Sequence, residues 1–482
     1  MFRIVLVLEK SSGSGSKWNA VVIIQAKIKI VKRAMNMKLV KGVSGRILAL
    51  VLLFPFTVYA EDAMRITLEQ ALEMAGKNSY ALKAAKARVD QAEARHVQSR
   101  KAFLPKVTLS ETFIATDDPA SVFTYKLRQG IINPATDFSA SALNDPDDIS
   151  NFHLGVEVMQ PIFNRDAVIG RSAASMSKKA QEHMLKRAEE TIALEVKKAY
   201  YGLVLARENL DAVNGSIRAM QLHDREAAKA YRKGLIAKSD KLSTAVRLAE
   251  LAEQKMMIED EIASAKDGLR FLLRLDSDID IVPVNGLETG SVVIPEAEPD
   301  MPEERADLKA LEASVDAAGY QYDMAKAKRL PRLNAFLQKD WNDEDFPGLG
   351  ETNWTLGLNM EWTIFDGYSN IGRAQEAKAG EMEIRYNYEE ARDRGLYEIR
   401  KAYRMLRTAE SRIKVAERSL KEARVSLDFI GGRYRSGLAM TFELLGREQA
   451  YTYARMRLNK ARYDLIMAKN ELDYYTGKQV GR

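Results

Sequence analysis

Residues 399–430 of the chain read IRKAYRMLRTAESRIKVAERSLKEARVSLDFI. Apolar residues recur here at alternating spacings of three and four, and for most of the way a large residue alternates with alanine: Ile399, Ala402, Leu406, Ala409, Ile413, Ala416, Leu420, Ala423, Leu427 and Ile430. Such a 3.5-residue repeat predicts a helix that supercoils against a closely packed neighbour. Since no proline follows Pro347, we expect one helix over residues 366–435. At roughly 1.5 Å per residue it would be about 100 Å long, too long for an ordinary globular domain.

The same apolar seam occurs a second time, 203 residues earlier in the chain. Its members are Val196, Ala199, Leu203, Ala206, Leu210, Val213, Ile217 and Met220. A short motif repeats at the same offset, because Tyr231-Arg232-Lys233-Gly234-Leu235 corresponds to Tyr434-Arg435-Ser436-Gly437-Leu438. Matches that keep their register indicate that the chain is a tandem duplication.

Each half also contains two strands ahead of its long helix. Apolar and polar residues alternate in four segments, near 107–113, 152–158, 333–341 and 354–364, and the long segment 117–150 has the composition of a loop. The order in each repeat is helix, strand, loop, strand, long helix, glycine turn and helix. We therefore expect a first repeat at 61–276 with a β-hairpin at 107–163, a Pro-rich linker at 277–304, a second repeat at 305–477 with a β-hairpin at 333–365, and a tail at 478–482.

The net charge of +6 is concentrated at the N-terminus. Residues 1–60 carry ten Lys or Arg and one Glu, so the remainder carries 63 basic and 66 acidic side chains. Binding to nucleic acid therefore has no electrostatic basis. A basic segment after Met37, an apolar run at 47–56 and a small residue at Ala60 predict a secretory signal peptide at 37–60, with a membrane anchor as the alternative. Residues 1–36 precede a plausible start and read as an upstream extension.

Residue types that carry catalysis or bind metals are sparse. The chain has no cysteine, and its four histidines lie in separate segments without metal-ligand spacing: His96, His153, His183 and His223. No phosphate-binding loop and no nucleophile motif is found in the sequence. We therefore expect no enzyme and no cofactor.

The clearest strand covers residues 354–364. One face is wholly apolar, the other carries Asn359 and Glu361, and Glu157 lies on the polar face of a strand in the first half. Trp354 and Trp362 are eight residues apart, a distance of roughly 26 Å at 3.3 Å per residue, which is close to the apolar band of a membrane barrel between its aromatic girdles. The spacing favours the two tryptophans facing lipid and the three polar residues facing a wet lumen. An ordinary amphipathic sheet packed on helices is the alternative.

A sheet in a bilayer must close on itself, because lipid cannot pair with the amides of a free edge. The chain offers four strands, whereas the smallest barrels of this kind have about eight. We therefore expect several chains to contribute strands to one barrel, and their amphipathic helices to close into a tube by rotation. A periplasmic coiled-coil structural or adaptor protein is the alternative that the helices leave open.

Several short motifs occur in a fixed order along the two halves. They are residues 66–72 (ITLEQAL), Leu104-Pro105 and Leu330-Pro331 before the hairpins, residues 160–163 (QPIF) and 362–367 (WTIFDG) after them, and the two Tyr-Arg-x-Gly-Leu turns. In this arrangement residues 65–477 resemble the TolC-like outer-membrane efflux proteins. The resemblance implies a mainly α fold with a membrane β-barrel. Duplicated long α-helical hairpins would form a trimeric helical tunnel, capped by a twelve-stranded barrel with four strands per chain.

Partners and function are implied by the same resemblance. It predicts a homotrimer in the cell outer membrane, in contact with outer-membrane lipid and extending into the periplasm. It also predicts docking to a periplasmic adaptor (membrane fusion) protein and an inner-membrane pump of the RND, ABC or MFS type. The chain would be the passive exit duct of a tripartite efflux or secretion system, for small molecules or proteins.

The two glycine turns are the candidate docking tips. Gly234 and Gly437 predict left-handed helix C-caps, but capping does not require the leucine that follows each glycine. The resemblance to the TolC-like family implies that Leu235 and Leu438 contact the adaptor, because they match the family positions that do so.

Three residues beside the turns match positions that, in the TolC-like family, hold the end of the tunnel closed. These are Asp240, Tyr434 and Glu443. Asp240, or Ser239 beside it, is also expected as the N-cap of the helix after the first turn. Where some relatives carry a further acid, this chain has Gly446, so a double ring of acids is not expected.

Overall fold

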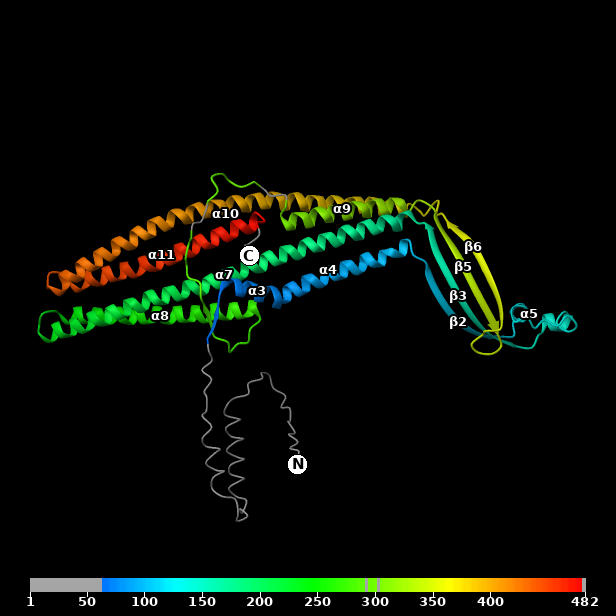
Figure 1. The fold of residues 1–482 in the computed structure, drawn as a ribbon, viewed down its shortest axis with the longest axis horizontal. Helices are drawn as coiled ribbons and strands as arrows, with labels where there is room; N and C mark the ends of the chain where they lie inside the picture. The colour runs from blue at the N-terminus through cyan, green and yellow to red at the C-terminus, as the bar shows by residue number, and fades with distance from the viewer. Residues whose placement is uncertain (1–62, 291–293, 301–303, 479–482) are drawn as a thin grey trace, which may run out of the picture. The chain divides into compact units, whose positions relative to one another are not determined.

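The computed structural model describes residues 63–290, 294–300 and 304–478. The expected upstream extension at 1–36, the signal peptide at 37–60 and the last four residues of the tail lie outside the described residues. Two pairs of long antiparallel helices and one four-stranded sheet are the largest parts of the described chain, and shorter helices and a two-stranded sheet accompany them (Figure 1).

The elements of the two repeats follow one another in a similar order. The first half contains β1 (Met64–Ile66), α3 (Leu68–Asn78), α4 (Tyr80–Gln98), η1 (Ser99–Ala102), β2 (Lys106–Thr116), α5 (Pro119–Arg128), α6 (Ala140–Asn144), β3 (Ile149–Phe163), α7 (Arg165–Arg232), α8 (Lys238–Leu273) and β4 (Ile281–Pro283). The second half contains α9 (Ala306–Ala327), β5 (Arg332–Asp343), β6 (Glu351–Glu361), α10 (Ser369–Arg435) and α11 (Thr441–Tyr475).

The heptad seam is buried in a helix pair. Ile399, Leu406 and Ala416 of α10 are at most 1% exposed, and they pack with Leu458 and Leu465 of α11 in one apolar cluster. The long helices α7 and α10 contain 68 and 67 residues, or about 100 Å at roughly 1.5 Å per residue. An isolated helix gains little stability of its own in water, so the pair of α10 and α11 is stabilised mainly by the packing of this apolar stripe.

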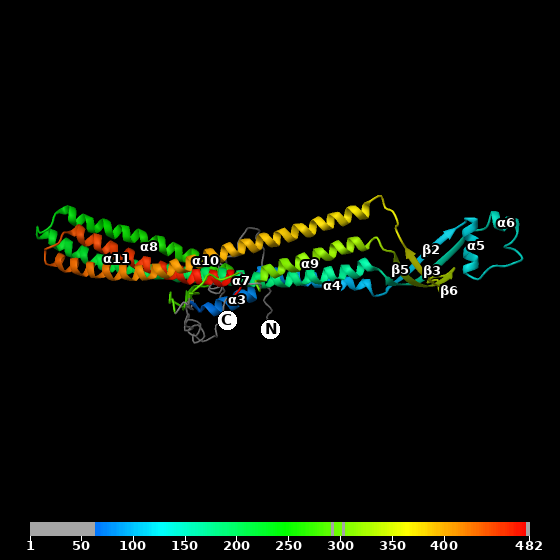
Figure 2. The ribbon, with the colours of Figure 1, turned by 90° about the horizontal axis from the view of Figure 1, so that it is seen from above.

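The two repeats pack against each other as well as within themselves. α7 contacts α8 and α4 from its own repeat, and α9 and α11 from the other. α10 runs beside α11 over one part of its length and beside α9 over another, as the view from above shows (Figure 2). Of the helices in residues 63–478 that the structure describes, none is both long enough and apolar enough to cross a bilayer.

The four long strands form one antiparallel sheet in the order β2-β3-β5-β6. β3 and β5 belong to different repeats, so the two repeats pair with each other in the middle of the sheet. β2 and β6 each have one hydrogen-bonding edge with no strand beside it in the described chain. These two edges are the positions at which further strands can add.

Two segments expected to be irregular contain regular structure. The loop at 117–150 includes α5, which begins with Asp118 as N-cap and Pro119 at the first position. Gln129 at its end donates to Asn151 of β3 at 2.9 Å, and this contact fastens the loop to the sheet. The linker after residue 276 contains β4, which pairs in parallel with β1.

Candidate functional site

Both long helices end in the same turn. Gly234 after α7 has a φ of +70°, and the next amide, of Leu235, donates to the carbonyl of Ala230 at 2.9 Å. Gly437 after α10 has a φ of +73°, and the amide of Leu438 makes the equivalent bond at 2.8 Å. These are Schellman motifs, in which glycine adopts a left-handed conformation that other residues avoid.

The leucine after each glycine is presented to solvent. In a Schellman motif this residue commonly contacts an apolar side chain in the last turn of the helix. The residues available there are Ala230 and Arg433, neither of which offers a large apolar surface. Leu235 and Leu438 are accordingly 73% and 68% exposed.

The acids beside the turns hold the starts of the following helices. Asp240 is the third residue of α8, and its carboxylate accepts a hydrogen bond from the amide of Ala237 at 3.3 Å. Glu443 accepts one from the amide of Met440, at 3.0 Å, at the start of α11. The expectation that Ser239 or Asp240 is itself the N-cap was wrong, because the helix begins after Ala237 and the carboxylate of Asp240 accepts from that residue's amide.

Tyr434 connects the second hairpin to the first. It lies in the last turn of α10, and its ring meets the ring of His223 from α7 edge-on, with 6.4 Å between centroids. Asp240 and Tyr434 therefore have different partners within one chain. A further expected closure residue, Glu443, lies on the opposite side of the second turn, at the start of α11.

The strand register sorts the side chains of the sheet into an apolar face and a polar face. Trp354 belongs to the apolar face, which continues across all four strands through Val107, Leu109, Val156, Val158, Leu337, Leu356, Leu358 and Met360. Glu157, Asn359 and Glu361 lie on the opposite face. Much of the apolar face is exposed in the single chain, and a contiguous patch of this kind marks a surface that something else covers.

Trp362 does not lie in the strand that was expected to contain it. β6 ends at Glu361, whose partner Arg332 is the first residue of β5, so no strand remains beside Trp362 to continue the ladder. Its indole nitrogen instead donates to the carbonyl of Arg329 at 3.0 Å. The expectation of a strand running to residue 364 was therefore wrong, and Trp362 lies at the junction of sheet and helices.

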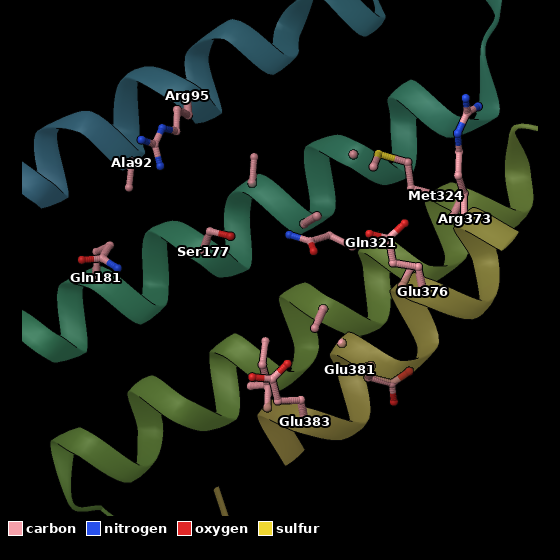
Figure 3. A pocket seen from close by; sticks show the side chains of 18 of the residues that line it. Ala92, Arg95, Ser177, Gln181, Gln321, Met324, Arg373, Glu376, Glu381 and Glu383 are labelled. Atoms are coloured by element: carbon pink, nitrogen blue, oxygen red, sulfur yellow. The ribbon is translucent and has the colours of Figure 1, made fainter. Parts of the chain in front are cut away.

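A groove of about 1000 Å³ lies on the helices next to the sheet. It is lined by α4, α7, α9 and α10, with small residues such as Gly170, Ala173 and Gly380 between the helices. Arg95 and Glu376 are among the charged residues that line it (Figure 3). Sequence reasoning missed this groove, because its helices come from both repeats. A wide, open groove with charges of both signs suits the wall of a water-filled duct better than an enzyme pocket, which is more enclosed and more apolar.

A buried polar network joins the two hairpins near the turns. Glu448 of α11 is 1% exposed, and its carboxylate accepts hydrogen bonds from Arg247 of α8 at 3.3 Å and from the hydroxyl of Thr452 at 2.9 Å. Thr452 also meets Ser216 of α7, 2.5 Å away. The sequence carried a signal for this network, because Arg247 and Glu448 each have an alanine at the equivalent position of the other repeat.

A second polar cluster fixes the start of α9. The guanidinium of Arg305 contacts both carboxylate oxygens of Asp307, at 2.8 and 2.6 Å, and Arg187 of α7 lies 3.7 Å from the same carboxylate. Burial alone would raise the pKa of Asp307, but the hydrogen bonds from Arg305 and the charge of Arg187 hold that pKa below its usual value. An ionised carboxylate therefore ties the second repeat to α7.

Long duplicated helical hairpins with leucines displayed at their turns, joined to an antiparallel sheet with an exposed apolar face, are the features of an outer-membrane channel. The family model described as outer membrane efflux protein matches residues 71–273 and 300–478, and the chain belongs to this family. It is a channel of the kind that serves tripartite efflux and type I secretion systems, and it spans the outer membrane and the periplasm. It is a transport protein and not an enzyme. The alternative, a periplasmic coiled-coil structural or adaptor protein, is therefore rejected.

Individual relatives are distant but similar in length. The alkaline protease secretion protein AprF of Pseudomonas aeruginosa is 20% identical over 427 residues, which are 86% of this chain and 85% of AprF. Protein CyaE of Bordetella pertussis is 25% identical over 323 residues, covering 64% of this chain and 67% of CyaE. The crystal structure of the Campylobacter jejuni CmeC outer membrane channel matches with a TM-score of 0.72 at 19% identity and covers 85% of each chain. The structural match shows a shared fold.

Proposed function

We propose that three copies of the chain close into one passive duct, with a twelve-stranded barrel in the outer membrane and a twelve-helix tunnel in the periplasm. The observation that carries this proposal is the sheet itself, which has an exposed apolar face and two unpaired edges. A strand edge with unpaired backbone groups is not stable in lipid, so β6 of one chain pairs with β2 of the next. Three chains supply twelve strands, within the range of known membrane barrels.

The faces of the sheet give the barrel its orientation. In this proposal Trp354 faces lipid and Trp362 marks the periplasmic interface, while Glu157, Asn359 and Glu361 line the water-filled lumen. Aromatic side chains at the two interfaces and polar side chains inside are the usual arrangement of such barrels. The repeats at 61–276 and 305–477 each supply one hairpin of strands and one of helices, joined by the linker at 277–304. The segment at 37–60 is removed as a signal peptide.

The glycine turns form the periplasmic end of the duct. Leu235 and Leu438 dock to a periplasmic adaptor, which connects the trimer to an inner-membrane pump. Asp240, Tyr434 and Glu443 hold the tunnel closed until docking occurs. The cargo class is small molecules or proteins, and the similarity to AprF, whose name describes protease secretion, favours a protein cargo.

Cross-linking of the purified protein tests the trimer, and the absence of native cysteine makes the experiment clean. Cysteines at Thr108 of β2 and Thr355 of β6, both on the polar face, should be joined between chains by a bis-maleimide and give dimer and trimer bands. The control pair Glu157→Cys and Gln338→Cys, which are register partners inside one chain, should give only a monomer band. Bands above the trimer, or no bands above the monomer, would refute the arrangement.

A further inference from the structure

The two turns carry different surfaces although they are copies of one motif. Residues 228–242 at the first turn hold five basic side chains and one acidic, whereas the equivalent residues 431–445 at the second hold two basic and one acidic. Both turns have the same backbone geometry, so the fold does not require the extra charge. Four lysines of the first turn have uncharged counterparts in the second: Lys229, Lys233, Lys238 and Lys241 correspond to Gly432, Ser436, Thr441 and Leu444.

The basic residues of the first turn surround a small groove. It has a volume of about 440 Å³, lies between the end of α7 and the start of α8, and is lined by Ala228, Tyr231, Arg232, Lys238, Lys241 and Leu242. Tyr231 and Leu242 are 41% and 48% exposed, so the groove combines an apolar floor with three cations. We call it the cationic tip groove.

The cations of the groove are available to a partner. The one acid within residues 228–242, Asp240, is engaged by the amide of Ala237 at the start of its own helix. Among the described residues, Arg232, Lys238 and Lys241 form no ion pair, whereas the neighbouring Arg247 is paired with both Glu250 and Glu448. The groove thus presents uncompensated positive charge beside the exposed Leu235.

The second turn presents the complementary kind of surface. Leu438, Met440 and Phe442 are each about two-thirds exposed, and the residues equivalent to the last two in the first turn are Ala237 and Ser239. One turn has therefore diverged toward charge and the other toward apolar area. A partner that contacts both turns needs acidic groups at one and apolar groups at the other.

We propose that the cationic tip groove binds carboxylate side chains at the helical tip of the periplasmic adaptor, while the second turn binds apolar side chains of the same partner. This inference rests on the proposed docking function and adds the sign of the charge. A free anion such as phosphate would gain nothing from Tyr231, Leu235 and Leu242, whereas an acidic helical tip can use both the charge and the apolar area. Complementary charge also steers the approach of a partner and excludes wrong ones.

Two synthetic helical-hairpin peptides provide the test. Both carry leucine at the tip, and they differ only in having two glutamates or two lysines beside it. Binding to the full-length trimer in nanodiscs is measured by fluorescence anisotropy. At about 0.1 M salt the glutamate peptide should bind about tenfold more tightly, since two exposed pairs at about 0.2–1 kcal/mol each replace two repulsions. At about 1 M salt, where the Debye length is about 3 Å, the two affinities should converge.

Matched variants assign the effect to the groove. Lys238→Glu with Lys241→Glu should reverse the preference toward the lysine peptide, and it preserves folding because acids are favourable in the first turn of a helix. Ser436→Glu adds negative charge to the second turn at the position equivalent to Lys233, and it should leave the preference nearly unchanged. Equal affinity of the two peptides, binding of neither, or an unchanged preference in the double variant would overturn the proposal.

Docking itself is measured separately. Leu235→Asp with Leu438→Asp should abolish cross-linking of the trimer to its adaptor in cells. If that cross-linking is lost but the peptides show no charge preference, the docking function is supported and the proposal of an acidic partner is refuted. If cross-linking persists, both the docking function and this inference fall.

Discussion

Replacing Glu448 by glutamine should loosen the attachment of the second hairpin to the first. The carboxylate is 1% exposed and lies between Arg247 and Thr452. Glutamine keeps the shape and removes the charge, so the guanidinium of Arg247, whose side chain is 8% exposed, keeps only the half-exposed Glu250. Removing one partner of a buried ion pair costs about 3–5 kcal/mol. Since about 1.4 kcal/mol corresponds to a factor of ten, local opening of the helices should become about a hundred to several thousand times more frequent.

Hydrogen exchange read by mass spectrometry measures this opening directly on the assembled protein. Peptides from 441–458 and 238–251 should exchange faster in Glu448→Gln, while peptides around Leu472 should be unchanged. Lys198→Met is the matched control, because it removes a partly exposed contact with Glu471 between the same hairpins. Its effect should stay within about 0.2–1 kcal/mol.

A double replacement separates the buried charge from the packing. Arg247→Met with Glu448→Leu exchanges the pair for apolar side chains of similar size, a change that is often neutral or stabilising by about 1–4 kcal/mol. It should restore slow exchange. Wild-type exchange in Glu448→Gln, or exchange in the double variant as fast as in the single one, would show that the buried pair does not hold the hairpins together.

Three further predictions concern the polar cluster of Arg305, Asp307 and Arg187, the sheet, and the turns. Asp307→Asn should destabilise the protein at neutral pH. The pKa of Asp307 is lowered in the folded chain, so the stability that its ionised carboxylate contributes is fully present above the usual carboxyl range and is lost as the pH falls through the folded pKa. The melting temperatures of wild type and variant should therefore converge in acid and not in alkali. In single-tryptophan variants, brominated acyl chains should quench Trp354 strongly and a tryptophan placed at Thr355 weakly, and equal quenching would reject the assigned faces. Asp240→Ala with Tyr434→Phe should raise single-channel conductance in planar bilayers, and an unchanged conductance would assign closure to other residues.

Helices and turns could be predicted because their determinants are local. The seam from Ile399 to Ile430 keeps one period for nine steps, so the sequence indicated α10 with an error of a few residues at its start. Gly234 and Gly437 indicated their turns because only glycine adopts that backbone conformation easily. The start of α5 had a local signal as well, in Asp118 followed by Pro119, but the polar composition of the surrounding segment outweighed it.

What could not be predicted depends on partners distant in sequence. The alternation of residues 354–364 continues beyond Glu361, yet the strand stops there because β5 supplies no further partner. The contact of His223 with Tyr434 and the burial of Glu448 both depend on which helices lie side by side. A heptad pattern shows that a helix has neighbours without showing which neighbours they are.

The pairing of β3 with β5 has a consequence for the origin of the chain. Because these strands come from different repeats, the junction inside the chain is of the same kind as the one proposed between β6 and β2 of adjacent chains. The protein can thus be regarded as two ancestral subunits fused end to end, and twice as many unfused copies would close the same ring. Cutting the backbone between β4 and α9 should then give fragments that reassemble, and circular permutants starting at α9 should fold. Because the two repeats are joined in one chain, first and second repeats must alternate around the ring. One turn could therefore become cationic and the other apolar while the order of the two kinds of turn stayed fixed.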